Sequence, residues 1–124
     1  MIDTKEINIQ DKLKIILEAI KEKKGKQIVS INLKKVNNSI SDYFVICHGE
    51  STTQVDAIAD SVQDKLKKES NIRAHHIEGT NNSEWVLIDY FDILVHIFLE
   101  EKRSFFNLED LWSDGEIERI EGEK

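Results

Sequence analysis

Apolar side chains recur every three or four residues in two stretches of the chain, which is the spacing of one helix face. The first stretch covers residues 8–24 and is followed by Gly25, a residue that favours the end of a helix. The second covers 51–69, and its apolar positions are Val55, Ile58, Ala59, Val62 and Leu66. We therefore expect a helix over each stretch.

Between and after these helices the pattern becomes typical of strands. Residues 27–33 alternate between apolar and polar side chains, as in a strand with one buried face. Residues 42–48 are apolar on both faces, which predicts a central strand covered by helices on each side. Further strands are expected at 73–78, 85–89 and 93–99, and a short helix at 107–112.

The order of these elements predicts a single α/β domain. A buried strand that leads into a helix favours a mixed sheet of about five strands flanked by helices. We assign the domain to residues 1–112. The acidic segment 113–124 lies outside it, and we expect it to be a flexible tail.

The charge of the chain narrows the choice of partners. Its 124 residues are the usual size of one domain, and 24 acidic against 17 basic side chains give a net charge of −7. A domain that grips nucleic acid through phosphates usually carries a basic surplus, so direct DNA binding is not expected. The negative charge instead favours basic partners, which include most ribosomal proteins.

Signals for targeting, membrane insertion or cofactor binding are weak. The N-terminal residues lack the basic and apolar regions of a secretory signal. The apolar stretch 85–99 is interrupted by Asp89, Asp92 and His96, which argues against a membrane span. Cys47 is the single cysteine and no two histidines have a metal-binding spacing, so we expect no disulfide, metal or cofactor. We expect a cytoplasmic protein.

Two features would suit a phosphate-handling enzyme, and each also has a structural explanation. The loop 49–54 leads into a helix, where backbone N–H groups can hold a phosphate. Ser51 and Gln54 fit a helix-capping box better, because no lysine follows as in a P-loop. Asp89 and Asp92 could bind Mg²⁺, or they could stabilise a turn.

Trp85 is the strongest candidate for a binding residue. Alternation along the strand places Trp85, Leu87 and Asp89 on one face and the residues between them on the other. An aromatic, an aliphatic and an acidic side chain together are typical of a protein interface. A tryptophan buried in the core is an equally good explanation at this point.

Three segments, read in order, carry a resemblance to a known family. The first covers 42–60 and reads DYFVIC, then GESTTQV and AIAD. The second covers 78–98 and includes WVLIDY-x-D and VHIF. The third, 103–112, contains Arg103 and FF-x-LE-x-LW. On these motifs the chain resembles the iojap family, the ribosomal silencing factors, over about residues 8–112.

The resemblance implies a fold similar to nucleotidyltransferases but without their catalytic carboxylates. It implies a translational repressor that binds the large ribosomal subunit through its ribosomal protein number fourteen. Occupying that surface blocks joining of the small subunit and lowers translation when nutrients are scarce. On this reading the protein is not an enzyme. The alternative is a nucleotidyltransferase-like or other phosphate-handling enzyme that uses the loop 49–54 with Asp89 and Asp92.

The motif match also implies which residues contact the partner. They are Trp85, Leu87, Asp89, Tyr90, Phe91, Asp92, His96 and Phe98. Members of the family usually carry glycine where this chain has Phe91, and a phenylalanine tolerates a positive φ poorly. Either the turn differs here, or Phe91 adds an apolar contact at its tip. Whether two copies form a homodimer through this surface, in competition with the ribosome, stays open.

Overall fold

The computed structural model of the protein describes residues 7–37 and 39–120. Its elements are α1 (Ile9–Glu22), β1 (Lys26–Asn32), β2 (Tyr43–Gly49), α2 (Thr52–Ser70), β3 (His76–Glu78), β4 (Trp85–Asp89), β5 (Ile93–Leu99), α3 (Glu100–Phe106), α4 (Leu108–Leu111) and β6 (Glu116–Arg119). Both long helices and all five expected strands are present, whereas α3 and β6 were not predicted. Among the described helices, none has the length and apolar run that crossing a bilayer requires.

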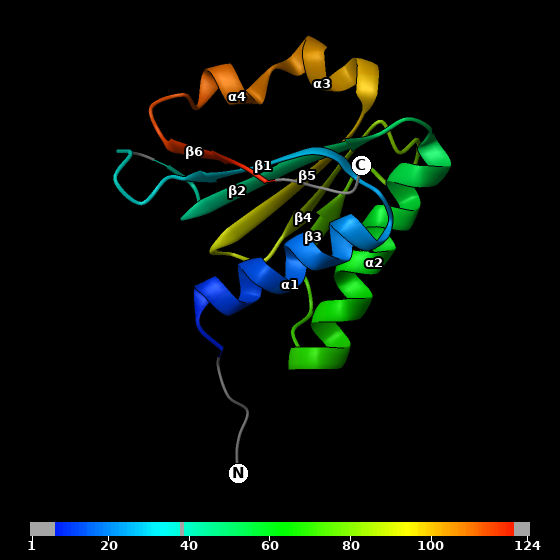
Figure 1. Ribbon diagram of the computed structural model, residues 1–124, viewed down its shortest axis with the longest axis horizontal. Coiled ribbons are helices and arrows are strands. Elements are labelled where there is room, and N and C mark those ends of the chain that lie inside the picture. The colour runs from blue at the N-terminus through cyan, green and yellow to red at the C-terminus, as the bar shows by residue number, and fades with distance from the viewer. Residues whose placement is uncertain (1–6, 38, 121–124) are drawn as a thin grey trace.

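The six strands form one mixed sheet in the order β3-β4-β5-β2-β1-β6. The central strands β2 and β5 run parallel, and the other neighbouring pairs are antiparallel. Helices α1 and α2 lie on one face of the sheet, and α3 and α4 lie across the other (Figure 1). The predicted single-domain α/β fold is confirmed, with six strands where about five were expected.

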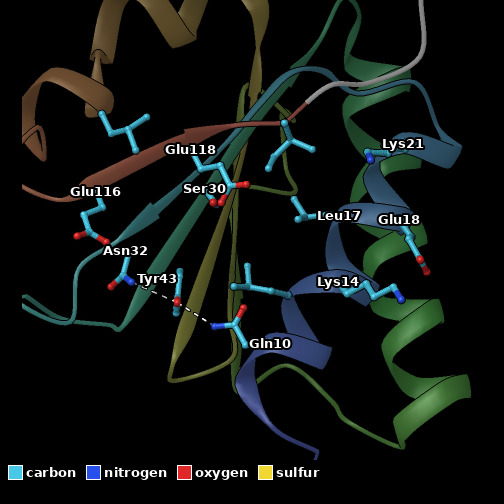
Figure 2. A pocket seen from close by; sticks show the side chains of 13 residues that line it. Gln10, Lys14, Leu17, Glu18, Lys21, Ser30, Asn32, Tyr43, Glu116 and Glu118 are labelled. Carbon is cyan, nitrogen blue, oxygen red and sulfur yellow. Dashed lines mark hydrogen bonds between the residues drawn. The ribbon is translucent and has the colours of Figure 1, made fainter.

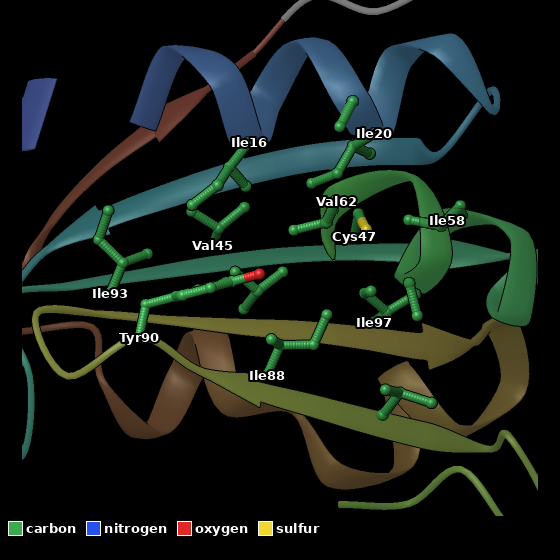
Figure 3. Packing of buried hydrophobic residues seen from close by; sticks show 14 of the residues in the cluster. Ile16, Ile20, Val45, Cys47, Ile58, Val62, Ile88, Tyr90, Ile93 and Ile97 are labelled. Carbon is green, nitrogen blue, oxygen red and sulfur yellow. The ribbon is translucent and has the colours of Figure 1, made fainter. Parts of the chain in front are cut away.

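The larger core lies between the sheet and the helices α1 and α2. All seven residues of β2 are buried, as its doubly apolar pattern predicted. Val45 and Cys47 point to the helical side, where Ile16, Ile20 and Ile58 pack around them (Figure 3). This packing makes β2 the structural centre of the molecule.

A smaller core lies on the opposite face, beneath α3 and α4. The alternate β2 residues Phe44 and Ile46 meet the β5 residue Phe98 there, and all three are almost completely buried. Trp85 and Leu87 pack against this core but stay partly exposed at its rim. The short helices therefore leave part of this sheet face open.

A hydrogen-bonded junction joins the start of α2 to the end of α1. The Ser51 hydroxyl accepts the Gln54 N–H at 3.1 Å, and the Gln54 side-chain carbonyl accepts the Glu50 N–H at 2.8 Å. The Gln54 amide then donates to the carbonyls of Lys23 and Lys24 at 3.1 and 3.0 Å. The predicted capping is confirmed, although Gln54 reaches Glu50 where an ordinary box would use the N-cap residue itself.

The C-terminal segment corrects the expectation of a flexible tail from residue 113. Residues Glu116–Arg119 form β6 and pair with β1, with Glu116 opposite Asn32 and Arg119 opposite Val29. The sequence pattern did not predict this strand, because its charged side chains lie at the sheet edge, where they face water. Gly115 permits the approach, since a Cβ there would lie 2.6 Å from the Ile31 side chain. Residues 121–124 lie outside the described residues.

Candidate functional site

The candidate site is the open rim of the smaller core with the two buried rings beneath it, which we call the aromatic face: Trp85, Leu87 and Phe106 at the rim, and His96 and Phe98 below. Trp85 of β4 stacks on Phe98 of β5 with ring centroids 5.0 Å apart. Phe106 of α3 packs against the same indole at 4.7 Å. Two other elements, β5 and α3, thus hold Trp85 in place, and Leu87 shares its face as alternation predicted.

A buried histidine anchors the polar edge of Trp85. The indole Nε1–H donates to Nδ1 of His96 at 3.1 Å. His96 is only 4% exposed and Phe98 is fully buried, so both support Trp85 from beneath. This placement corrects the expectation that His96 and Phe98 touch a partner directly.

The burial of His96 predicts acid sensitivity. Burial lowers the pKa of His96 from 6.5 to about 4. The unfolded chain therefore binds a proton below pH 6.5 that the folded protein takes up only near pH 4. We expect His96 to remove about 3 kcal/mol of unfolding free energy as pH falls from 6.5 to 4. Urea titrations of wild type and His96→Phe at both pH values test this, because only the wild type carries that loss. Equal pH dependence in the two proteins would contradict it.

The turn between β4 and β5 is closed by Asp89. Its carboxylate accepts the Phe91 N–H at 2.7 Å, which confirms the turn-stabilising reading of Asp89. Phe91 has a φ of 71° and is 67% exposed, and its ring centroid lies 4.1 Å from that of His75. The turn therefore keeps the left-handed conformation that a glycine would permit, and Phe91 adds an apolar side chain at its tip.

Two substitutions of Phe91 separate backbone strain from loss of the ring. Both Phe91→Gly and Phe91→Ala remove the ring, but only glycine adopts a positive φ without steric cost. We expect Phe91→Gly to be more stable than Phe91→Ala by about 1 kcal/mol. Urea unfolding of the two variants measures the difference. Equal stabilities would mean that the turn relaxes to another conformation.

Asp92 and Tyr90 are engaged within the fold. Both carboxylate oxygens of Asp92 accept from Lys12 Nζ of α1 at 2.9 Å, and the Asp92 carbonyl accepts the N–H groups of Asp42 and Tyr43. Tyr90 points into the larger core (Figure 3), where burial raises its pKa and its hydroxyl finds no partner among the residues described. Tyr90 therefore does not belong to the exposed surface, and Asp92 is tied to α1.

The structure adds an apolar ridge that the sequence did not indicate. Phe105 and Leu111, on α3 and α4, are 78% and 71% exposed. Phe105 packs edge-on against Phe106, so Phe105 continues the aromatic face, whereas Leu111 is exposed on the following helix. The signal was present, because Phe105 and Phe106 fall in the third matching segment. Without a predicted helix there, no face could be assigned to them.

Arg103 fastens α3 to the sheet and so fixes the position of Phe105 and Phe106 on the same helix. The side chain is buried and forms two hydrogen bonds with the Glu109 carboxylate, at 3.1 and 3.0 Å. Its Nη1 also donates to the Lys26 carbonyl at 3.3 Å and lies 3.0 Å from His48 Nδ1. Burial, and then the Arg103 charge, lower the pKa of His48, so Nδ1 is free to accept. One guanidinium thus links α3, α4, β1 and β2.

The residues of the enzyme alternative do not form one site. Gly49 ends β2, whereas Asp92 precedes β5 and meets Tyr43 at the opposite end of β2. The seven-residue strand separates the loop 49–54 from Asp89 and Asp92 by about 20 Å. Within the described chain, no group of three or more His, Cys, Asp or Glu could hold a metal.

A groove of about 580 Å³ runs along α1 on the other face of the sheet. Figure 2 shows Leu17 on its helix side, Glu116 and Glu118 on the β6 side, and Ser30 and Tyr43 between them. Gln10 donates to the Tyr43 hydroxyl at 3.0 Å and so closes one end. The groove shares no residue with the aromatic face, so it does not contribute to the candidate site.

Comparison with known proteins decides the family. A model of the family described as "Ribosomal silencing factor during starvation" matches residues 6–124. The chain belongs to this family. It is 40% identical to the ribosomal silencing factor of Halalkalibacterium halodurans over 91% of this chain and 95% of that one. It is 37% identical to that of Bacillus subtilis, over 90% and 92%.

Solved structures agree with the family. A crystal structure of a Chromobacterium violaceum protein is 35% identical and superposes with a TM-score of 0.81, over 95% of this chain and 90% of that one. The chloroplastic protein iojap of Zea mays is 35% identical over 72 residues, 58% of this chain and 31% of that protein. The resemblance read from the motifs is confirmed, and with it a role in ribosome silencing as a regulatory protein.

Proposed function

We propose that the protein represses translation in the cytoplasm by occupying the large ribosomal subunit at its ribosomal protein number fourteen. The bound domain would then block joining of the small subunit, without catalysis or a cofactor. The observation that carries the proposal is the aromatic face. Trp85 is half-buried there and packs against Phe106, which is 42% exposed and in turn contacts the exposed Phe105. Contiguous exposed apolar surface on a soluble domain marks an interaction site.

Charge and size support a basic protein partner. The net charge of −7 favours association with a basic ribosomal protein and speeds the encounter. A specific interface needs about 800 Å² from each partner, which one face of a domain this size can supply. Five of the expected contact residues stay in the proposed contact surface because the structure leaves each of them partly or largely exposed: Trp85, Leu87, Asp89, Phe91 and Asp92. Phe105 and Leu111 join them.

Co-sedimentation with separated ribosomal subunits tests the proposal. We expect the protein to sediment with the large subunit and to reduce formation of joined ribosomes when small subunits are added. Sedimentation with neither subunit would contradict the proposal if the protein is monomeric by light scattering. A dimer that dissociates on binding would show that the aromatic face also serves self-association.

A further inference from the structure

We infer that His96 is a positioning residue that sets the orientation in which Trp85 is presented to the partner. The inference rests on the proposed function, because it assigns a role within the same contact surface. His96 itself stays beneath the surface and acts through the indole.

Stacking alone does not fix the Trp85 ring. Phe98 and Phe106 contact the indole through ring packing, which is less directional than a hydrogen bond and leaves some freedom of rotation about the side-chain bonds of Trp85. The hydrogen bond from Nε1 to His96 Nδ1, at 3.1 Å, is directional and fixes that rotation. Among the described residues it is the one polar contact that the indole makes.

The stability of the fold does not account for a histidine at this position. Because Nδ1 accepts the indole proton, the neutral ring carries its own proton on Nε2. That Nε2 is buried and has no hydrogen-bond partner in the part of the chain that the structure describes. A buried donor without an acceptor destabilises the folded state. An apolar ring of similar size would remove that donor, at the expense of the acceptor for the partly exposed indole N–H, so the histidine brings little net stability. The neighbours Phe44 and Phe98 already make the surroundings aromatic.

Two substitutions distinguish positioning from packing. His96→Phe keeps an aromatic ring and removes the acceptor. We expect its melting temperature at neutral pH to stay close to that of the wild type, while affinity for the large subunit falls about tenfold. His96→Asn returns a carbonyl oxygen close to the position of Nδ1, so affinity should recover to within about threefold of the wild type. A purely structural role predicts the reverse, with reduced stability and unchanged affinity in the folded His96→Phe protein.

A double-mutant cycle assigns the effect to the hydrogen bond. Trp85→Phe removes the donor and keeps an aromatic ring. If the two side chains act together, His96→Phe adds no further loss of affinity in the Trp85→Phe background. Additive losses would overturn the inference, as would wild-type affinity in His96→Phe.

Nuclear magnetic resonance provides a readout that does not need the ribosome. The indole N–H signal of Trp85, assigned with Trp112→Phe, should shift and broaden in His96→Phe but not in His76→Gln, which alters an exposed histidine. An unchanged Trp85 signal overturns the inference even where wild-type binding is normal. Failure of the wild type to bind would instead refute the proposed function, and the signal would still report whether His96 orients the indole.

Discussion

Replacing Trp85 with alanine is expected to lower affinity for the large ribosomal subunit about thirtyfold or more. Tryptophan at the centre of an interface commonly contributes 2 kcal/mol or more, and about 1.4 kcal/mol corresponds to a tenfold change. Trp85 has the required setting, because Phe98 and Phe106 hold it while part of the ring stays exposed. Co-sedimentation over a range of protein concentrations measures the change.

Trp112→Ala is the matched control for this result. Trp112 is also partly buried on the same side of the sheet, but its ring packs edge-on against Phe44, whereas that of Trp85 packs against Phe98 and Phe106. Both variants lose one tryptophan, and circular dichroism checks that both stay folded. Wild-type affinity in folded Trp85→Ala would remove Trp85 from the contact surface. An equal loss in Trp112→Ala would show that the loss is not specific to Trp85.

The largest expected change in stability follows from Arg103→Met. We expect the free energy of unfolding to fall by about 3 kcal/mol, because the change removes one partner of a buried ion pair. Glu109 would keep its charge without the guanidinium, and Lys26 and His48 would lose their hydrogen bonds. Urea unfolding at neutral pH measures the loss.

Two further variants test the reason for that loss. Lys102→Met removes the neighbouring charge, but its ion pair with Glu84 is long, 3.7 Å, and exposed, so we expect a cost below about 1 kcal/mol. In the double variant Arg103→Met with Glu109→Met no buried charge is left unpaired, since Arg119, which also lies 4.0 Å from Glu109, is exposed to water, and part of the stability should return. A small cost for Arg103→Met alone would mean that water satisfies Glu109 once the arginine is gone.

The sequence predicted the aromatic face only in part. Alternation placed Trp85 and Leu87 together because the side-chain period of a strand is two residues. It could not show that Phe106 completes the cluster, because α3 follows β5 at once with no capping side chain at its start. Phe105 was missed for the same reason, whereas Leu111 lies in the short helix that was predicted at 107–112.

Other errors come from contacts between distant parts of the chain. The motif match placed Tyr90 among the partner-binding residues. Its ring instead packs into the larger core, directly after the end of β4. The sequence also could not show that Lys12, 80 positions earlier, binds the Asp92 carboxylate, which stays 33% exposed. Spacing along the chain cannot reveal such pairs, because only the folded sheet brings α1 beside the turn before β5.

The two edge strands of the sheet, β3 and β6, limit the ways in which the protein can bind a partner. At one margin β3 has three residues, including His76 and Glu78, and at the other β6 has four, including Glu116 and Glu118. Short, charged edge strands resist the addition of a further strand from another chain. Recognition by backbone pairing is therefore disfavoured at both sides. We therefore expect a partner to bind through side chains on a face of the sheet. Shape and chemical complementarity, and not the register of strand pairing, would then determine specificity.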